Sequence, residues 1–322
     1  MTVPYTQLIL RCTTSPEPAT AAPDRCKCYN YKAYGGYSSA AERLTVAQDV
    51  VGSIPTSRPN GAPTEVIDVS SADGLSPRVS SAMTIGDIFV GCSGWAYTSW
   101  KPDFYPSSVP AKKLLEYYAT RLNSVEVNYT FRSLPSATTV GSWLASTRSD
   151  FRFSFKAPQR VTHILRLKNC GEALDRFAQA ITAVHEAGRL GLILFQLPPN
   201  MKADADRLSA FLDDARPMGF RISFEFRHPS WFDEPTFSLL RDHSAALCVA
   251  ESDELTTPDE VTAPFTCYRL RRTGYSAADL QTIAGKLKLR ATHGDVFAYF
   301  RHEEQPTGAL QAASVLKEIR GA

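Results

Sequence analysis

Polar or charged side chains alternate with apolar ones in three short stretches of the sequence. SVEVN carries Glu126, FRFSFK ends on Lys156, and FEFR carries Glu225 and Arg227. Successive side chains of a β-strand point to opposite faces, so in each stretch the charges share one face and the apolar residues share the other. Carboxylates and amines that meet at one site can transfer protons and bind an anionic substrate.

The three stretches belong to a longer series of strand-like segments. Short apolar runs occupy residues 88–92, 124–131, 151–158, 191–199, 220–228, 246–252, 265–271 and 296–302. Most of them are followed by a segment of helical periodicity, such as GEALDRFAQAITAVHEAG, whereas ALCVAES is followed by a polar segment without a clear helix. Eight strands alternating with helices indicate parallel βαβ units. From Met83 onward the chain is about 240 residues long, which fits a (β/α)8 or TIM barrel of typically about 250 residues.

A doubly wound open sheet is the alternative α/β architecture. It is disfavoured because the loop after the first apolar run reads GCSGWAY and not the glycine-rich GxGxxG pattern. In a barrel the outward residues pack under helices, so the polar residues would point inward and meet at the carboxyl ends of the strands, where TIM-barrel active sites lie. The same charges could instead neutralise one another as a structural network, since buried charges need partners.

Position near the predicted strand ends selects the candidate site residues. We expect Glu126 and Glu225 to act as general acid and base, with His163 of QRVTH assisting them. The expected substrate-binding residues are Ser93, Trp95, Tyr97, Asn128, Lys156, Gln196, Arg227, His228, Trp231, Tyr268 and Arg269. The aromatic members can stack on a ligand or simply pack in the core, and the basic members can bind an anion. No metal ligand is assigned.

Five strings of the sequence carry a family resemblance. In chain order they are GCSGWAYTSWKPDFYP, SVEVNYTFRSLP, FRFSFKAPQRVTH, LILFQLPP and FEFRHPSW. They resemble the signature segments of domain-of-unknown-function family 72 (DUF72), the YecE-like proteins, over residues 88–319. The resemblance implies a TIM-barrel fold and does not name a reaction. Two places depart from the family pattern: Arg132 stands where an aromatic residue is usual, and Arg301 and His302 stand where asparagines are usual.

The composition and net charge of the chain indicate which partners and which cellular compartment to expect. The formal net charge is +2, which gives no bulk electrostatic reason to expect a nucleic acid or a membrane as partner. No apolar run reaches the roughly 18 residues of a transmembrane helix, and the first residues show no secretory signal pattern. The seven cysteines contain no CxxC pair, so neither a zinc site nor a disulfide framework is indicated, and a cytoplasmic location is expected.

The first 82 residues differ in composition from the rest of the chain. All four Trp and all six His lie after residue 83, while the earlier part is rich in Pro, Ser, Ala and Gly. Such a segment buries too little apolar surface to offset the entropy lost on ordering, so we expect a disordered N-terminal extension.

Possible codons suggest an origin for this extension. VGSIP can be encoded by DNA containing GGTTCGATTCC, which looks like a tRNA T-arm, and YSSA by DNA containing the D-arm-like AGCTCAG. Residues 35–59 correspond to 25 codons, or 75 nucleotides, about the length of one tRNA gene. We therefore hypothesise that residues 1–82 are a mistranslated upstream segment containing a tRNA gene, and that the barrel domain is 83–322.

Three functions are compatible with the candidate residues. We favour an enzyme, a hydrolase or an isomerase, acting on a small polar or anionic substrate that contains a phosphate or a sugar. The second is a metal-dependent phosphodiesterase or endonuclease acting on nucleic acid. The ligand types that it needs are present, but no HxH or HExxH motif brings them together: His163, His228, Glu126, Glu225, Glu251 and Asp253. The third is a ligand-binding barrel without catalysis. The cofactor stays unassigned, with a divalent metal as the candidate.

Overall fold

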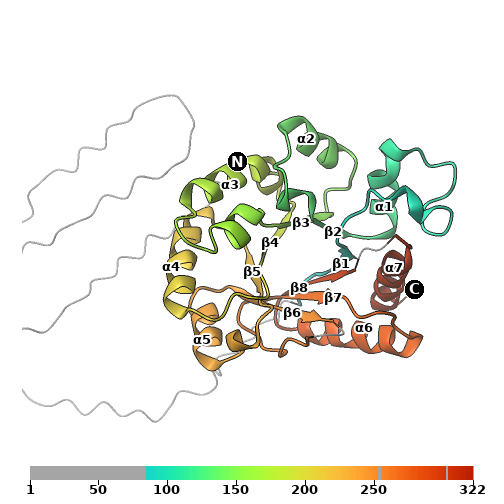
Figure 1. Cartoon of the computed structure of the whole chain (residues 1–322). Helices are drawn as coiled ribbons and strands as arrows, with labels where there is room; N and C mark the ends of the chain where they lie inside the picture. Colours follow the sequence, from blue (N-terminus) through green and yellow to red (C-terminus); the bar gives the residue numbers. More distant parts are fainter. Residues whose placement is uncertain (1–84, 253–254, 302–303, 322) are drawn as a thin grey trace, which may run out of the picture. The chain divides into compact units, whose positions relative to one another are not determined.

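Eight parallel strands with helices around them form the described part of the chain (Figure 1). The computed structural model describes residues 85–252, 255–301 and 304–321. The segment 1–82 with its hypothetical tRNA origin, and the single residues Asp253 and His302, lie outside the described residues. The strand order β1-β8-β7-β6-β5-β4-β3-β2 follows the chain around one sheet, so the predicted (β/α)8 barrel is confirmed.

Each predicted apolar run overlaps one strand. The strands are β1 (Ile88–Cys92), β2 (Ser124–Val127), β3 (Arg152–Lys156), β4 (Leu190–Gln196), β5 (Ile222–Glu225), β6 (Ala246–Glu251), β7 (Phe265–Leu270) and β8 (Asp295–Phe300). The α-helices are α1 (Leu114–Arg121), α2 (Ala137–Ala145), α3 (Gly171–Glu186), α4 (Ala205–Ala215), α5 (Glu234–Asp242), α6 (Ala277–Ala291) and α7 (Thr307–Arg320). Between β6 and β7 the described residues form no helix, as the polar sequence there indicates.

Polar side chains fix the start of several helices. Asp204 caps α4 by accepting from the backbone N–H of Arg207 at 3.0 Å. At α6, Ser276 and Asp279 form a capping box in which each side chain accepts the other's backbone N–H. Such caps satisfy N–H groups that have no partner inside the helix. Among the described residues, no helix is both long enough and apolar enough to cross a membrane.

Strand alternation separates the barrel interior from the surface that packs under the helices. Outward-facing Phe153 and Phe155 of β3 pack against Trp143 of α2, at ring distances of 6.3 and 6.4 Å. The interior is filled by a separate buried cluster: Phe89, Leu192, Leu194, Ala246, Cys248, Phe265, Cys267, Phe297 and Tyr299. The hydroxyl of Tyr299 donates to Ser154 Oγ at 2.6 Å. This packed interior forms the floor beneath the carboxyl ends of the strands.

Side chains join β1 to β2, the two ends of the strand order. The Asn123 amide donates to the carbonyl of Ile88 at 2.8 Å, and its Oδ1 accepts from the N–H of Val90 at 2.8 Å. A Cβ at Gly91 would lie 1.9 Å from the carbonyl oxygen of Ser124, so only glycine permits this approach. The first and second strands are thus held together, and residues of both can contribute to one site.

Candidate functional site

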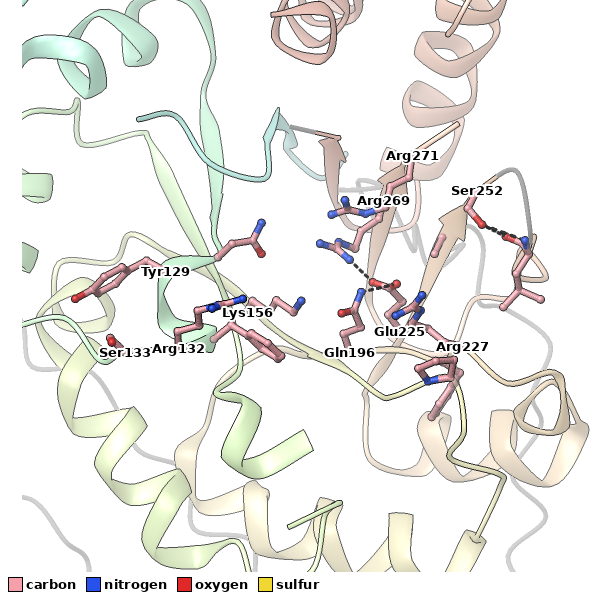
Figure 2. A pocket seen from close by; sticks show the side chains of 16 residues that line it. Tyr129, Arg132, Ser133, Lys156, Gln196, Glu225, Arg227, Ser252, Arg269 and Arg271 are labelled. Atoms are coloured by element: carbon pink, nitrogen blue, oxygen red, sulfur yellow. Dashed lines mark hydrogen bonds and ion pairs between the residues drawn. The ribbon is translucent and has the colours of Figure 1, made fainter. Parts of the chain in front are cut away.

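A cavity of about 790 Å³ lies at the carboxyl ends of the strands (Figure 2). Its lining comes from β2 to β7 and the segments that follow them: Asn128, Tyr129, Phe131, Arg132, Ser133, Lys156, Gln196, Pro199, Glu225, Phe226, Arg227, Ala250, Ser252, Leu255, Arg269 and Arg271. Five of these side chains are basic and one is acidic. The lining therefore has a strong excess of positive charge.

Arg269 of β7 binds two buried carboxylates at the base of the cavity. Its Nη2 lies 2.6 Å from Glu126 Oε1 and its Nε donates to Glu126 Oε2 at 2.9 Å, while Nη1 donates to Glu225. The arginine is 2% exposed and the two carboxylates are 0% and 4% exposed. Bidentate arginine–carboxylate pairs are among the strong interactions in proteins, so strands β2, β5 and β7 are tied together here.

The same arginine sets the ionisation of both carboxylates. Burial on its own raises the pKa of Glu126, but the charges of Arg269 and Arg271 outweigh burial and bring this pKa down to about 2. The same balance holds the pKa of Glu225 below its ordinary value. A general base works best with a pKa near the working pH. Both groups are thus firmly ionised and paired, which does not favour the proton-transfer role expected for them.

Lys156, at the end of β3, enters the cavity without a carboxylate partner. Its Nζ lies 4.1 Å from the centre of the Phe131 ring. Among the described residues, no ion pair and no hydrogen bond involves its ammonium group. Burial, and then repulsion by Arg269, outweigh the attraction of the two carboxylates and lower the pKa of Lys156 to about 8. Figure 2 shows it reaching in from the side opposite Glu225 and Arg269.

Three further polar contacts order the wall of the cavity. Gln196 of β4 donates to Glu225 Oε1 at 2.8 Å. Arg271, just beyond β7, donates to Ser93 Oγ at 2.8 Å and lies 3.5 Å from Glu126 Oε1. Every oxygen of the two carboxylates therefore has a cationic or amide partner.

Two buried polar atoms of this wall have no hydrogen-bond partner among the described residues. They are Oδ1 of Asn128 and Nε of Arg271, an acceptor and a donor. The Asn128 amide nitrogen is already used, since it donates to the carbonyl of Ser93 at 3.2 Å. A buried polar atom left without a partner costs about 1–3 kcal/mol. Both atoms are thus suited to contact a bound ligand or water.

Comparison with known proteins identifies the family. A family model described as "Protein of unknown function DUF72" matches residues 89–322. This chain belongs to the DUF72 family. The match covers most of the chain and confirms the resemblance carried by the five sequence strings.

Bacterial relatives agree with this assignment. UPF0759 protein YecE of Escherichia coli (strain K12) is 32% identical over 146 residues, which are 45% of this chain and 50% of that protein. UPF0759 protein YunF of Bacillus subtilis (strain 168) is 26% identical over 155 residues, 47% of this chain and 54% of that protein. The chain thus spans about half the length of the curated relatives it matches.

Solved structures share the fold. A DUF72 family protein from Thermotoga maritima MSB8 matches with a TM-score of 0.64 at 25% identity, covering 73% of this chain and 99% of that one. A DUF72 family protein from Enterococcus faecalis V583 matches with a TM-score of 0.60 at 16% identity, covering 74% of this chain and 99% of that one. The barrel is therefore an architecture found in experimental structures of this family.

In the DUF72 barrel, the two tryptophans expected to bind substrate pack in the protein body. Trp231 is fully buried, its ring stacks on Phe226, and its Nε1 donates to the carbonyl of Met201 at 2.8 Å. Trp95 packs edge-on against Trp143, with ring centres 5.6 Å apart. Neither residue lines the cavity, so their aromatic area stabilises the fold.

The two tyrosines of the expected set also lie away from the cavity. Tyr97 packs against Trp100, with ring centres 4.9 Å apart. Tyr268 is the neighbour of Arg269 on β7 and therefore points to the opposite face, where its hydroxyl donates to Asp259 at 3.1 Å. Strand parity allows only one of two adjacent residues to face the barrel interior.

The two histidines of the expected set are engaged in local contacts. His163 Nδ1 is 2.8 Å from Thr162 Oγ1, and its ring packs edge-on against Phe131 at 5.1 Å, behind the cavity lining. Burial, and then nearby cations, lower its pKa. His228 Nδ1 accepts from the backbone N–H of Ser230 at 3.1 Å and so caps the short turn after β5.

The residues suggested for a metal site are not gathered into one. Within 85–252, 255–301 and 304–321, no group of three or more His, Cys, Asp or Glu is placed to hold a metal ion. Glu251 instead lies 3.4 Å from Arg272, beside a second cavity. The described members of the suggested set therefore do not form a ligand group.

Two cavity cations are absent from the substrate-binding set expected from the sequence. Arg271 shares its parity with Arg269 but lies beyond the end of β7, where alternation alone does not fix the direction of a side chain. Arg132 follows the 3-10 turn Tyr129–Phe131 and is one of the positions that depart from the family pattern. This departure from the family pattern is the feature of the sequence that could have marked Arg132 as a candidate site residue.

Proposed function

We propose that this DUF72 chain is an enzyme acting on a small anionic substrate at the C-terminal mouth of its barrel. The observation that carries the proposal is the charge of the cavity. Five basic side chains line it against Glu225 alone, and adding Glu126 beneath them still leaves three positive charges in excess. Among the cations other than Arg269, Lys156 and Arg271 are half-buried, whereas Arg132 and Arg227 are exposed at the mouth. A half-buried charge needs a partner, and an anion supplies one.

The excess charge lies on side chains suited to a phosphate or carboxylate group. Arg269 is occupied by the two glutamates, so the excess is carried by the other cations, Arg132, Lys156, Arg227 and Arg271. Guanidinium groups match the geometry of both anions. The volume of about 790 Å³ falls within the roughly 300–1,000 Å³ of pockets that bind small molecules.

Lys156 favours an enzyme over a binding protein without catalysis. A pKa of about 8 allows this amine to give or take a proton near neutral pH. A site that only holds a ligand needs no titratable group of this kind. The lysine therefore takes the proton-transfer role that the sequence suggested for the two glutamates.

Anion binding by the full chain tests this function. Isothermal titration calorimetry with inorganic phosphate, sugar phosphates and short carboxylic acids should detect binding that weakens as salt is added. Arg227→Gln should raise the Kd about tenfold, which corresponds to about 1.4 kcal/mol. Arg176→Gln, which removes an exposed arginine of α3, is the matched control and should leave the Kd unchanged.

Three results would contradict the proposal. If none of these anions binds, or if Arg176→Gln weakens binding as much as Arg227→Gln does, the cavity is not the anion site. If anions bind at the cavity but none is converted to a product, the chain is a binding protein without catalysis.

A further inference from the structure

The amine of Lys156 is placed as a nucleophile would be. The side chain leaves the last position of β3 and enters the cavity, where its Nζ lies over the Phe131 ring. The two carboxylates that could hold it as an ammonium ion, Glu126 and Glu225, are both bound by Arg269. Neither these two nor any other described residue forms an ion pair with Lys156.

Desolvation next to another cation is a known way to activate a lysine. Lys156 meets both conditions, because burial and the charge of Arg269 each lower its pKa, to about 8. At pH 7 such an amine is roughly one-tenth neutral, against fewer than about one in a thousand for an ordinary lysine. Only the neutral amine can attack a carbonyl carbon.

We propose that Lys156 forms an imine with the carbonyl carbon of a small anionic aldehyde or ketone bound in the cavity. The inference rests on the proposed function, since it uses the same anion site and specifies the substrate class. The anionic group would contact the cavity arginines, such as Arg227 and Arg132. The carbonyl would then lie deeper, between Lys156 and the side of the cavity formed by Glu225 and Arg269 (Figure 2).

The step is balanced without any oxidant or reductant. The amine nitrogen attacks the carbonyl carbon, the π electrons move to the carbonyl oxygen, which takes a proton, and the nitrogen loses one. The proton that the ammonium released on becoming the neutral amine then protonates the hydroxyl group of the carbinolamine, which leaves as water while the C=N bond forms. Overall, an ammonium ion and a carbonyl give a protonated imine and water. The protonated imine keeps the positive charge of the ammonium.

Reductive trapping with glyoxylate and cyanoborohydride tests the inference on the full chain. Peptide mapping by mass spectrometry at pH 7.5 should find the reduced adduct on Lys156, formed about tenfold or more faster than on the exposed Lys202. Acetaldehyde, a neutral probe, should show a smaller preference for Lys156. Lys156→Arg keeps the charge, removes the nucleophile, and should abolish the fast adduct.

A competition experiment needs no variant. Inorganic phosphate should slow labelling at Lys156 and leave labelling at Lys202 unchanged. If calorimetry detects phosphate binding but glyoxylate labels Lys156 no faster than Lys202, the imine proposal is wrong and the proposed anion site stands. If phosphate does not bind and Lys156 is not labelled faster, both proposals fail.

Discussion

Arg269→Met is expected to destabilise the barrel by about 3–5 kcal/mol at pH 7, because two buried carboxylates lose their main partner. For a domain of this size the loss corresponds to a fall in Tm of roughly 6–20 °C. Thermal and urea unfolding followed by circular dichroism would measure both quantities. Wild-type stability at pH 7 in this variant would contradict the role given to the arginine.

The pH dependence of the variant provides a second readout. In the wild type the pKa of Glu126 is about 2, against an ordinary 4.5, so its contribution to stability is present above pH 4.5 and is lost as the pH falls towards 2. In Arg269→Met, burial should raise the carboxylate pKa values, so the variant should gain stability on mild acidification. Removing both charges as well, in Glu126→Gln/Glu225→Gln/Arg269→Met, should recover much of the loss.

Lys156→Met is expected to stabilise the protein at pH 7 by about 3 kcal/mol, since the pKa of Lys156 lies about 2.5 units below its ordinary value and each pKa unit corresponds to about 1.4 kcal/mol. The folded-state pKa of about 8 lies below the ordinary 10.5. The unfolded state therefore binds more protons between these values, and wild-type stability should rise with pH across this window. The variant should lack that rise, so its advantage should disappear above pH 10.5.

Lys202→Met is the matched control for this prediction. Lys202 is exposed, and its replacement should change stability by less than about 0.5 kcal/mol. A Lys156→Met variant that is less stable than wild type at pH 7 would show that the ammonium is well accommodated. Stabilisation together with loss of anion binding would instead mark a residue kept for function at the expense of stability.

Strand parity made a large part of the site predictable. Glu126, Lys156 and Glu225 each alternate with apolar residues, and alternation is a local property that survives in any sheet. The eight strands could be predicted for the same reason, because each is a short apolar run, most of them followed by a helix. Closure of the sheet into a barrel then brings Glu126, Lys156 and Glu225 together at the carboxyl ends of the strands.

The sequence could not predict which charged residues of the site pair with one another. Arg269 is 143 residues from Glu126 and 44 residues from Glu225, and their contact depends on how the strands are staggered around the barrel. Trp231 follows a strand in a turn, where no periodicity fixes its direction. Tyr268 could have been excluded, because the parity that turns Arg269 inward turns its neighbour outward.

The pKa of Lys156, with and without inorganic phosphate, is the measurement that tests anion binding at this cavity most directly. The pH dependence of competitive acetylation, followed by mass spectrometry, reports it for individual lysines. We expect about 8 in the free protein and a clear rise when phosphate is bound, because a nearby anion favours the ammonium form. A pKa near the ordinary 10.5 that phosphate does not move would contradict the proposed site.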